Sequence, residues 1–253
     1  MLPVNALQIA LQNWVAKLDK TFIQSGHYKM ILEGLGSTVK ITIGALIIGV
    51  IIGLSGGILA ALAYPVYNAM VKALLSEDRE ALKRLRKKSR TLKRDLEVLR
   101  ENEVLPTLRT LPKELADRGQ LVFRITEISL NTCERLLTLV KASYNHIDNN
   151  HQGLSKEQGD DLLALTNKIG RFYPDLTDML KAGNFDGINN LLEEREQLSE
   201  DFADCITRHL MHNTADESGM RNGILYLTLL NETRAMISHA FALIERVKEI
   251  YED

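Results

Sequence analysis

The carboxylates best placed to bind a metal ion are Glu127 and Glu232, because each lies among apolar residues of a predicted helix. Carboxylates that face one another from different helices of a bundle can hold a hard or transition metal ion. Asn131 lies one helical turn after Glu127 and would add a neutral carbonyl oxygen. Glu127, Asn131 and Glu232 are therefore the candidate metal ligands of this sequence.

Glu196, Glu200 and Asp204 form a second acidic group, with a spacing of four residues that places them on one helix face. The surrounding segment is rich in charge. A charged helix face normally lies against water, opposite an apolar face that packs in the core. We therefore expect these three carboxylates to face solvent.

The histidines offer weaker evidence for a metal site. His209 and His212 are three residues apart, so both imidazoles could lie on one helix face, and His146 and His151 flank an asparagine-rich turn. A zinc site needs at least a third ligand, which neither pair has nearby. Surface polar residues are the favoured interpretation of both pairs.

Motifs typical of an enzyme are absent from the sequence. There is no phosphate-binding P-loop, no G-x-S-x-G, no H-E-x-x-H and no four-ligand Cys/His cluster. We therefore expect a protein without catalytic activity and without a cofactor, and a metal-dependent enzyme is the weakest alternative.

A dense basic cluster occupies the helix predicted from residue 66 to 100. Its members are Lys83, Arg84, Arg86, Lys87, Lys88, Arg90, Lys93 and Arg94. Leucines at positions 82, 85, 92, 96 and 99 keep the spacing of a bundle seam, and Ser89 fills the one missing seam position. The basic residues are thus predicted to occupy the remaining, outward faces.

This basic helix could contact anionic lipid head groups or a phosphate-bearing ligand, and a solvated face is the alternative. Basic residues next to a membrane gain about 1 kcal/mol each near an anionic lipid surface. Nucleic acid is a poor partner, since the net charge is -2 and no aromatic residue interleaves the cluster.

An uncharged stretch lies before the basic helix, between Lys40 and Lys72. Its apolar run exceeds the roughly 20 residues that a membrane-spanning helix needs, so residues 41–64 are predicted to form one transmembrane helix. Small residues recur every four positions on one face, at Ala45, Gly49, Gly53, Gly57 and Ala61. Such a stripe allows close approach of another helix, from a transporter or from a second copy of the chain.

The distribution of basic residues predicts the orientation of this span. Lysines are sparse before it, whereas the basic helix follows it closely. By the positive-inside rule, the N-terminus lies outside and the C-terminal part lies in the cytoplasm, at the cell inner membrane. Cys133 and Cys205 fall in this cytoplasmic part, where thiols stay reduced, so no disulfide is expected.

Apolar periodicity predicts an all-α chain. Residues 5–24 read as an amphipathic interfacial helix within an N-terminal segment, residues 1–40. After the basic helix, Pro106 and Pro112 predict a linker or turn, and helices follow over about 115–149, from Ser155 to a break at 183–187, over 188–212 and over 219–251. Ser155 and Gln158 form a capping-box pattern, and Pro174 predicts a bend. Short connections favour an antiparallel bundle from 65 to 253.

Three strings carry a resemblance to a known family: AYPVYNAMVKALLSEDREALKRLRK, YNHIDNNHQGLSKEQ and GMRNGILYLTLLNETRAMISHAFALIE. With them, residues 65–253 resemble the PhoU-like cytoplasmic domain of bacterial inorganic phosphate transporters. The resemblance implies a helical bundle that regulates phosphate uptake and binds metal clusters through E/D-x-x-x-D motifs. Here the equivalent segments, EISLN from Glu127 and ETRAM from Glu232, keep only the first carboxylate. The resemblance therefore implies regulation through protein contacts rather than a metal cluster.

The first 64 residues resemble a different family. The string YKMILEGLGSTVKITIGALIIGVIIG is similar to the N-terminal end of a polar amino-acid ABC transporter permease. The two resemblances meet near residues 57–65, which predicts a hybrid chain. The expected function is a membrane-anchored regulatory or accessory domain of inorganic phosphate transport, and a truncated or fused permease subunit is the alternative.

Overall fold

The computed structural model describes residues 63–211 and 217–252, together with 17, 29–30, 33–38, 42 and 49. The predicted interfacial segment and transmembrane helix therefore lie outside the described residues, except for these isolated positions. Among the helices that are described, none is both long enough and apolar enough to cross a bilayer.

The described chain is helical apart from short connections and contains no strand, which confirms the all-α prediction. Its helices are α3 (Tyr64–Leu75), α4 (Arg79–Leu99), α5 (Leu105–Thr110), α6 (Ala116–Asp148), α7 (Lys156–Ala182), α8 (Ile188–Met211) and α9 (Glu217–Glu252). A π-helical turn, Arg100–Val104, joins α4 to α5, and a 3-10 turn, Lys113–Leu115, precedes α6.

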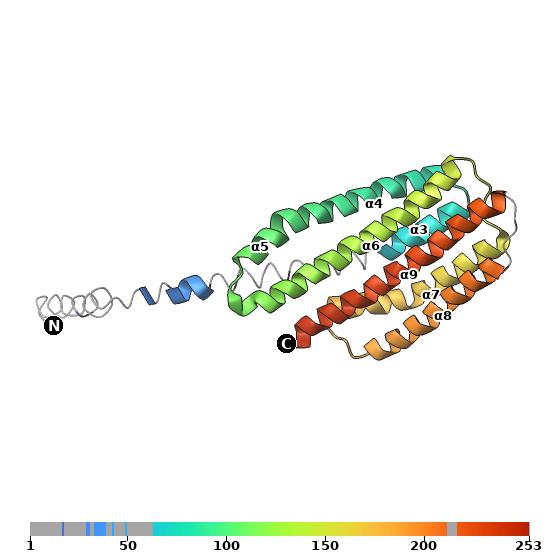
Figure 1. Cartoon of the computed structure of the whole chain (residues 1–253). Helices are drawn as coiled ribbons and strands as arrows, with labels where there is room; N and C mark the ends of the chain where they lie inside the picture. Colours follow the sequence, from blue (N-terminus) through green and yellow to red (C-terminus); the bar gives the residue numbers. More distant parts are fainter. Residues whose placement is uncertain are drawn as a thin grey trace, which may run out of the picture.

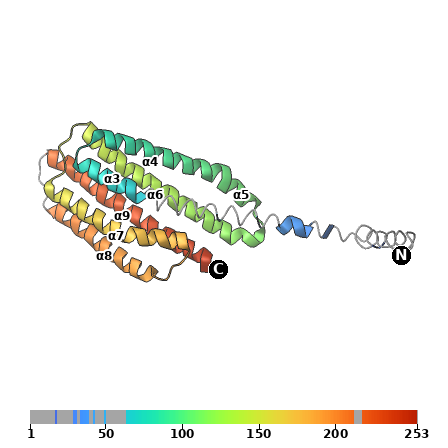
Figure 2. The same ribbon diagram turned by 180° about the vertical axis from the view of Figure 1, so that it is seen from behind.

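Successive long helices run up and down beside one another in an antiparallel bundle (Figure 1). The long helix α6 packs mainly against α4 on one side and α9 on the other. The α7–α8 hairpin covers α9, and the short α3 fits between α4, α6 and α7. Seen from behind, α4 and α8 again lie at opposite sides of the bundle (Figure 2). The helices α4 and α8 thus form two separate outer faces of the bundle.

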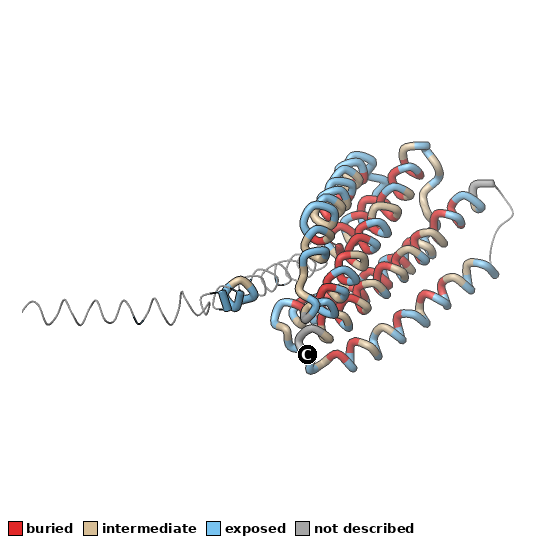
Figure 3. Tube along the Cα trace, turned by 60° about the vertical axis from the view of Figure 1, so that its left-hand side comes forward, coloured by how far each residue is buried: buried red, intermediate tan, exposed pale blue. Residues whose placement is uncertain are grey.

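Buried residues gather where the helices face one another, and exposed residues line the outer surfaces (Figure 3). One core unites α3, α4 and α6 to α9. Its largest fully buried side chains are Tyr67, Tyr226, Phe202, Phe241, Met70, Leu82, Ile125, Leu136, Leu139, Leu162 and Ile169. A buried leucine-sized side chain contributes about 1.5–3 kcal/mol, so this core is the main source of bundle stability.

The structure corrects the single helix predicted from residue 66 to 100, which is broken at residues 76–78. Glu77 has a left-handed backbone with φ 54°, although it is not glycine. Asp78 then caps α4, since its carboxylate accepts a hydrogen bond from the Ala81 amide at 2.8 Å. The break therefore depends on a helix cap rather than on glycine or proline, the breakers that a sequence usually shows.

Of the linker or turn predicted around Pro106 and Pro112, the structure has only a short turn at Leu111 and Pro112. Residues 100–110 stay helical, because the π turn leads directly into α5 and Pro106 occupies its first turn, where a missing amide is tolerated. The chain direction changes only at Leu111 and Pro112, whose backbones are extended.

The remaining helix predictions are confirmed to within a few residues. Ser155 caps α7 with the expected capping box: its hydroxyl accepts from the Gln158 amide at 3.2 Å, and the Gln158 side chain accepts from the Ser155 amide at 2.9 Å. Pro174 lies inside α7, which continues to Ala182 and ends at Gly183 with φ 63°. The break before α8 lies where predicted.

Candidate functional site

The helix α4 presents a buried seam to the bundle and a basic face to solvent. Leu82 and Leu96 are 0% and 4% exposed, and Ser89 is 1% exposed, so the predicted seam is confirmed. Of the eight basic residues, Lys83, Arg84, Lys87, Lys88, Arg90 and Arg94 are exposed, and Arg86 and Lys93 are half-buried. The basic cluster therefore lies on the outward faces, as the spacing predicts.

Half of these basic residues have partners within the bundle. Lys83 lies 3.8 Å from a Glu80 carboxylate oxygen and Lys93 lies 3.2 Å from one of Glu134. Arg94 pairs with the adjacent Asp95 at 3.3 Å. The guanidinium of Arg86 lies over the Tyr144 ring, 3.8 Å from its centroid.

The other half, Arg84, Lys87, Lys88 and Arg90, forms no ion pair with any residue that the structure describes. We call Arg84, Lys87 and Lys88 the basic rim, since these three border one cavity. Their charges are directed at solvent and are available to an external anion.

The cavity beneath the basic rim has a volume of about 420 Å³. Its apolar wall is made by Val66 of α3, Leu92 of α4 and Leu136 of α6, and Ser89, Thr91 and Asp95 complete the lining. The Ser89 hydroxyl is buried and has no hydrogen-bond partner within the described structure. The cavity thus combines an apolar wall, one buried hydroxyl without a partner and the basic rim.

The two candidate metal-binding carboxylates, Glu127 and Glu232, take part in separate ion pairs. Glu127 accepts a hydrogen bond from Arg100 at 3.1 Å, and Glu232 accepts two from Arg135, at 3.0 and 3.2 Å. Asn131 is exposed on α6. Within the described ranges, no group of three or more His, Cys, Asp or Glu has the geometry of a metal site. Each carboxylate is therefore held by an arginine from a neighbouring segment.

The other acidic residues and the histidines follow their predicted roles in part. Glu196, Glu200 and Asp204 are exposed on α8, which confirms that they face solvent. His146 is only 6% exposed, so the surface position predicted for it is wrong. Its ring stacks edge to face on His151 with centroids 5.2 Å apart, and one ring nitrogen lies 2.8 Å from the Gln152 carbonyl oxygen. The partner proposed for His209, at position 212, lies outside the described residues.

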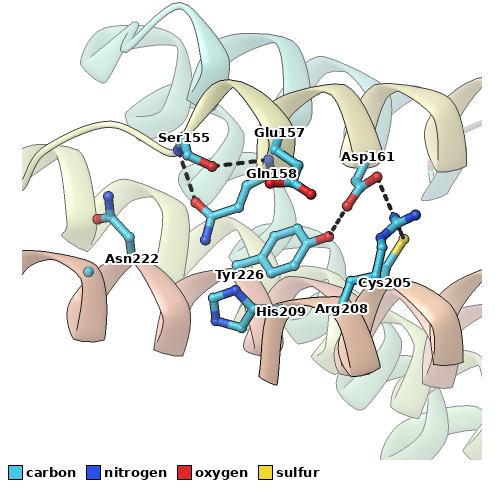
Figure 4. A pocket seen from close by; sticks show the side chains of 10 residues that line it. Ser155, Glu157, Gln158, Asp161, Cys205, Arg208, His209, Asn222 and Tyr226 are labelled. Carbon is cyan, nitrogen blue, oxygen red and sulfur yellow. Dashed lines mark hydrogen bonds and ion pairs between the residues drawn. The ribbon is translucent and has the colours of Figure 1, made fainter. Parts of the chain in front are cut away.

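A polar pocket of about 230 Å³ joins the ends of α7, α8 and α9 (Figure 4). At its centre Asp161 accepts a 2.7 Å hydrogen bond from the Tyr226 hydroxyl and another of 2.7 Å from Arg208. Arg208 also reaches the Cys205 sulfur at 3.3 Å. Sequence reasoning misses this cluster, because its members come from three helices and share no spacing motif.

Asp161, Tyr226 and Arg208 satisfy one another in the polar pocket, whereas His209 Nε2 and Asn222 Oδ1 are buried there without a hydrogen-bond partner within the described structure. Burial, together with the hydrogen bond to Asp161, raises the pKa of Tyr226, so the hydroxyl keeps its proton and donates it to the carboxylate. Burial also raises the pKa of the Cys205 thiol, which therefore is no activated nucleophile. His209 lies edge-on to Tyr226 with centroids 5.2 Å apart. The pocket is a structural network that joins three helices.

The two cysteines are free and buried, and burial raises the pKa of Cys133 to about 12. Of the small-residue stripe only Gly49 falls within the described part, where a side chain added at this position would meet nothing within 4 Å. Ala45, Gly53, Gly57 and Ala61 lie outside it.

The site thus belongs to an all-α bundle with one cationic, cavity-bearing face. No protein-family model matches the chain, and no curated protein is significantly similar to it.

Proposed function

We propose that this chain is a membrane-anchored helical domain that regulates or supports inorganic phosphate transport, without catalysis. In this proposal residues 41–64 span the inner membrane with the N-terminus outside, and a PhoU-like bundle lies in the cytoplasm. The observation that carries it is the basic face of α4, where Arg84, Lys87, Lys88 and Arg90 are exposed and unpaired within the described chain.

The charge distribution of the bundle supports contact with an anionic membrane surface. The helices α4 and α8 lie at opposite sides of the bundle (Figures 1 and 2). The first carries the exposed basic residues, and the second carries the exposed carboxylates Glu196, Glu200 and Asp204. An anionic surface attracts the first face and repels the second. Each basic residue close to such a surface contributes about 1 kcal/mol, so the orientation with α4 toward the lipid is favoured.

The position of α4 in the chain supports the same orientation. The helix begins at Arg79, and the only described helix between it and the predicted span is α3, 12 residues long. This short connection keeps the basic face near the membrane. A transporter that shares the membrane would then contact the anchored bundle or the predicted span, and bundle movements would alter phosphate uptake.

Chemical labelling of lysines in the full chain tests the contact with lipid. The chain is reconstituted in vesicles of phosphatidylcholine alone or with added phosphatidylglycerol, and acetylation of each lysine is followed by mass spectrometry. We expect the anionic lipid to slow labelling of Lys87 and Lys88 and to leave Lys156 and Lys181 of α7 unchanged. Equal labelling of Lys87 and Lys88 in both vesicles would contradict the proposal.

Uptake of labelled inorganic phosphate by cells tests the proposed role in phosphate transport. Cells that express the full chain are compared with cells that express the variant Arg84→Gln/Lys87→Gln/Lys88→Gln. The matched control, Arg171→Gln/Lys156→Gln/Lys181→Gln, removes the same charge from exposed positions of α7. We expect only the α4 variant to change the uptake rate. If neither expression of the chain nor either variant changes uptake, a role in phosphate transport is excluded.

A further inference from the structure

We propose that the cavity beneath the basic rim binds one acyl chain of an anionic membrane phospholipid, whose phosphate lies between Arg84, Lys87 and Lys88. This inference rests on the proposed function, because it requires the basic face to lie at the membrane. It extends that function from a surface attraction to a built lipid site.

The cavity borders the one position of the α4 seam that is not leucine. Leucine precedes Ser89 in the seam at positions 82 and 85 and follows it at 92, 96 and 99. A serine side chain is much smaller than leucine, and protein cores normally leave few voids larger than a water molecule. Here the small side chain leaves space beside a cavity of about 420 Å³, which Val66, Leu92 and Leu136 bound.

Of the buried hydroxyls in the described core, those of Ser89 and Thr233 have no hydrogen-bond partner, and of these two only Ser89 lines the cavity. Ser129 and Ser143 on α6 each donate to the carbonyl oxygen four residues earlier at 2.9 Å. Ser89 is 1% exposed, yet its oxygen has no partner within the described structure. A buried polar group left without a partner costs about 1–3 kcal/mol. A lipid ester oxygen that displaces the atoms covering this hydroxyl would accept its hydrogen bond.

The chemistry of the lining selects an amphiphile with a negative head. The wall of Val66, Leu92 and Leu136 suits a hydrocarbon chain, and the basic rim suits a phosphate. Asp95, the one acidic residue of the lining, is neutralised by Arg94 at 3.3 Å. A neutral lipid would leave the rim unpaired, and a small anion would leave the apolar wall unoccupied.

The cavity is also placed where a membrane lipid could enter. Val66 lies in the first turn of α3, two residues beyond the predicted end of the span at residue 64. The apolar wall therefore begins where the chain leaves the bilayer in the proposed orientation. A lipid of the cytoplasmic leaflet could place its head on the rim and one chain in the cavity.

A fluorescent lipid tests this site in the full chain. The protein is reconstituted in phosphatidylcholine vesicles and titrated with phosphatidylglycerol that carries an environment-sensitive nitrobenzoxadiazole group on one acyl chain. We expect a saturable rise in emission that unlabelled phosphatidylglycerol reverses and unlabelled phosphatidylcholine does not. The variant Ser89→Leu should weaken binding at least tenfold, which corresponds to about 1.4 kcal/mol, because the larger leucine side chain would take up space that the acyl chain needs.

The control variant Ser199→Leu makes the same substitution at an exposed position of α8 and should bind the lipid like the wild type. Ser89→Ala keeps the cavity open and removes only the hydroxyl, so it should weaken binding by less than Ser89→Leu. This second variant keeps the test decisive if leucine disturbs the seam. Equal binding by wild type, Ser89→Leu and Ser89→Ala would overturn the proposal.

Failure of this inference can be separated from failure of the proposed function. Ser89→Leu leaves the basic rim intact, so anionic vesicles should still protect Lys87 and Lys88 from acetylation. If those lysines are protected but the wild type binds no labelled lipid, the lipid site is wrong and the membrane contact stands. The same holds if residues 41–62 of the chain itself fill the cavity, or if phosphatidylcholine competes as well as phosphatidylglycerol.

Discussion

The basic face of α4 and the polar pocket at the ends of α7, α8 and α9 contain similar side chains in opposite states. In the pocket, Arg208 and Tyr226 both donate to Asp161 at 2.7 Å, so the charge of Asp161 is satisfied internally. Two other atoms of the lining, His209 Nε2 and Asn222 Oδ1, are buried without a partner in the described structure. On α4, Arg84, Lys87 and Lys88 have no ion pair within the described chain, and the buried hydroxyl beside them has no partner. The first arrangement holds helices together, and the second is open to a ligand.

This difference shows why a cluster of polar residues does not by itself indicate a binding site. A partly buried ion pair is costly to break because its partners lose their only compensation. An exposed, unpaired cation contributes little to folding, so its removal affects stability little. Stability measurements on matched variants therefore distinguish the two regions.

The largest effect is expected for Asp161→Ala in the polar pocket. This change leaves the Tyr226 hydroxyl, on a residue that is 1% exposed, without its acceptor, and it leaves Arg208 without its carboxylate. We expect the free energy of unfolding to fall by about 2 kcal/mol, measured by denaturant titration. Glu200→Ala on the exposed face of α8 is the control and should change it by less than about 0.5 kcal/mol. Equal effects of the two changes would contradict a structural role for the pocket.

A smaller effect of opposite sign is expected at Ser89. Alanine removes a buried hydroxyl that has no partner, so we expect Ser89→Ala to raise the free energy of unfolding by about 1 kcal/mol. Ser143→Ala is the matched control in the same core, because its hydroxyl donates to the Leu139 carbonyl at 2.9 Å. That change should not stabilise the protein. If Ser89→Ala is destabilising by thermal unfolding, the hydroxyl has a partner that stabilises the fold.

Alkaline pH should weaken the polar pocket through Tyr226. Burial raises the pKa of this side chain, so the folded protein keeps the proton above the ordinary tyrosine pKa of about 10, where the unfolded chain loses it. The free energy of unfolding should therefore fall as the pH rises above about 10. Tyr226→Phe should make this fall shallower. Tyr67 and Tyr173, whose pKa values burial also raises, leave part of the fall in the variant. An unchanged slope would show that Tyr226 ionises normally.

The sequence predicts most of the fold because the long helices depend on local signals. The apolar stripes of α6, α7, α8 and α9 and the Ser155 capping box fix these helices to within a few residues. The break at Glu77 is missed because its left-handed backbone occurs at a residue type that rarely adopts it. The acidic cap at Asp78, with Glu80 in the first turn, is the signal that could have revealed it.

The sites are less predictable, since they depend on contacts between distant helices. The outward position of the basic cluster follows from the seam spacing alone. The cavity cannot be predicted in this way, because a neighbouring side chain could equally have filled the space beside a serine in the seam. The pairing of Glu127 with Arg100 and of Glu232 with Arg135 likewise requires the packing of segments that are far apart in sequence.

The smallest stability effect is expected where the most charge is removed. The variant Arg84→Gln/Lys87→Gln/Lys88→Gln deletes three exposed cations that have no partner in the described bundle. Because no ion pair is broken, the free energy of unfolding should change by less than about 0.5 kcal/mol in neutral vesicles or detergent. In the wild type, phosphatidylglycerol vesicles should slow the exchange of the backbone amide hydrogens of α4. This protection from hydrogen exchange should nevertheless disappear in the variant. A loss of more than about 1 kcal/mol would instead mean that these cations stabilise the bundle itself, and the contrast with the polar pocket would no longer hold.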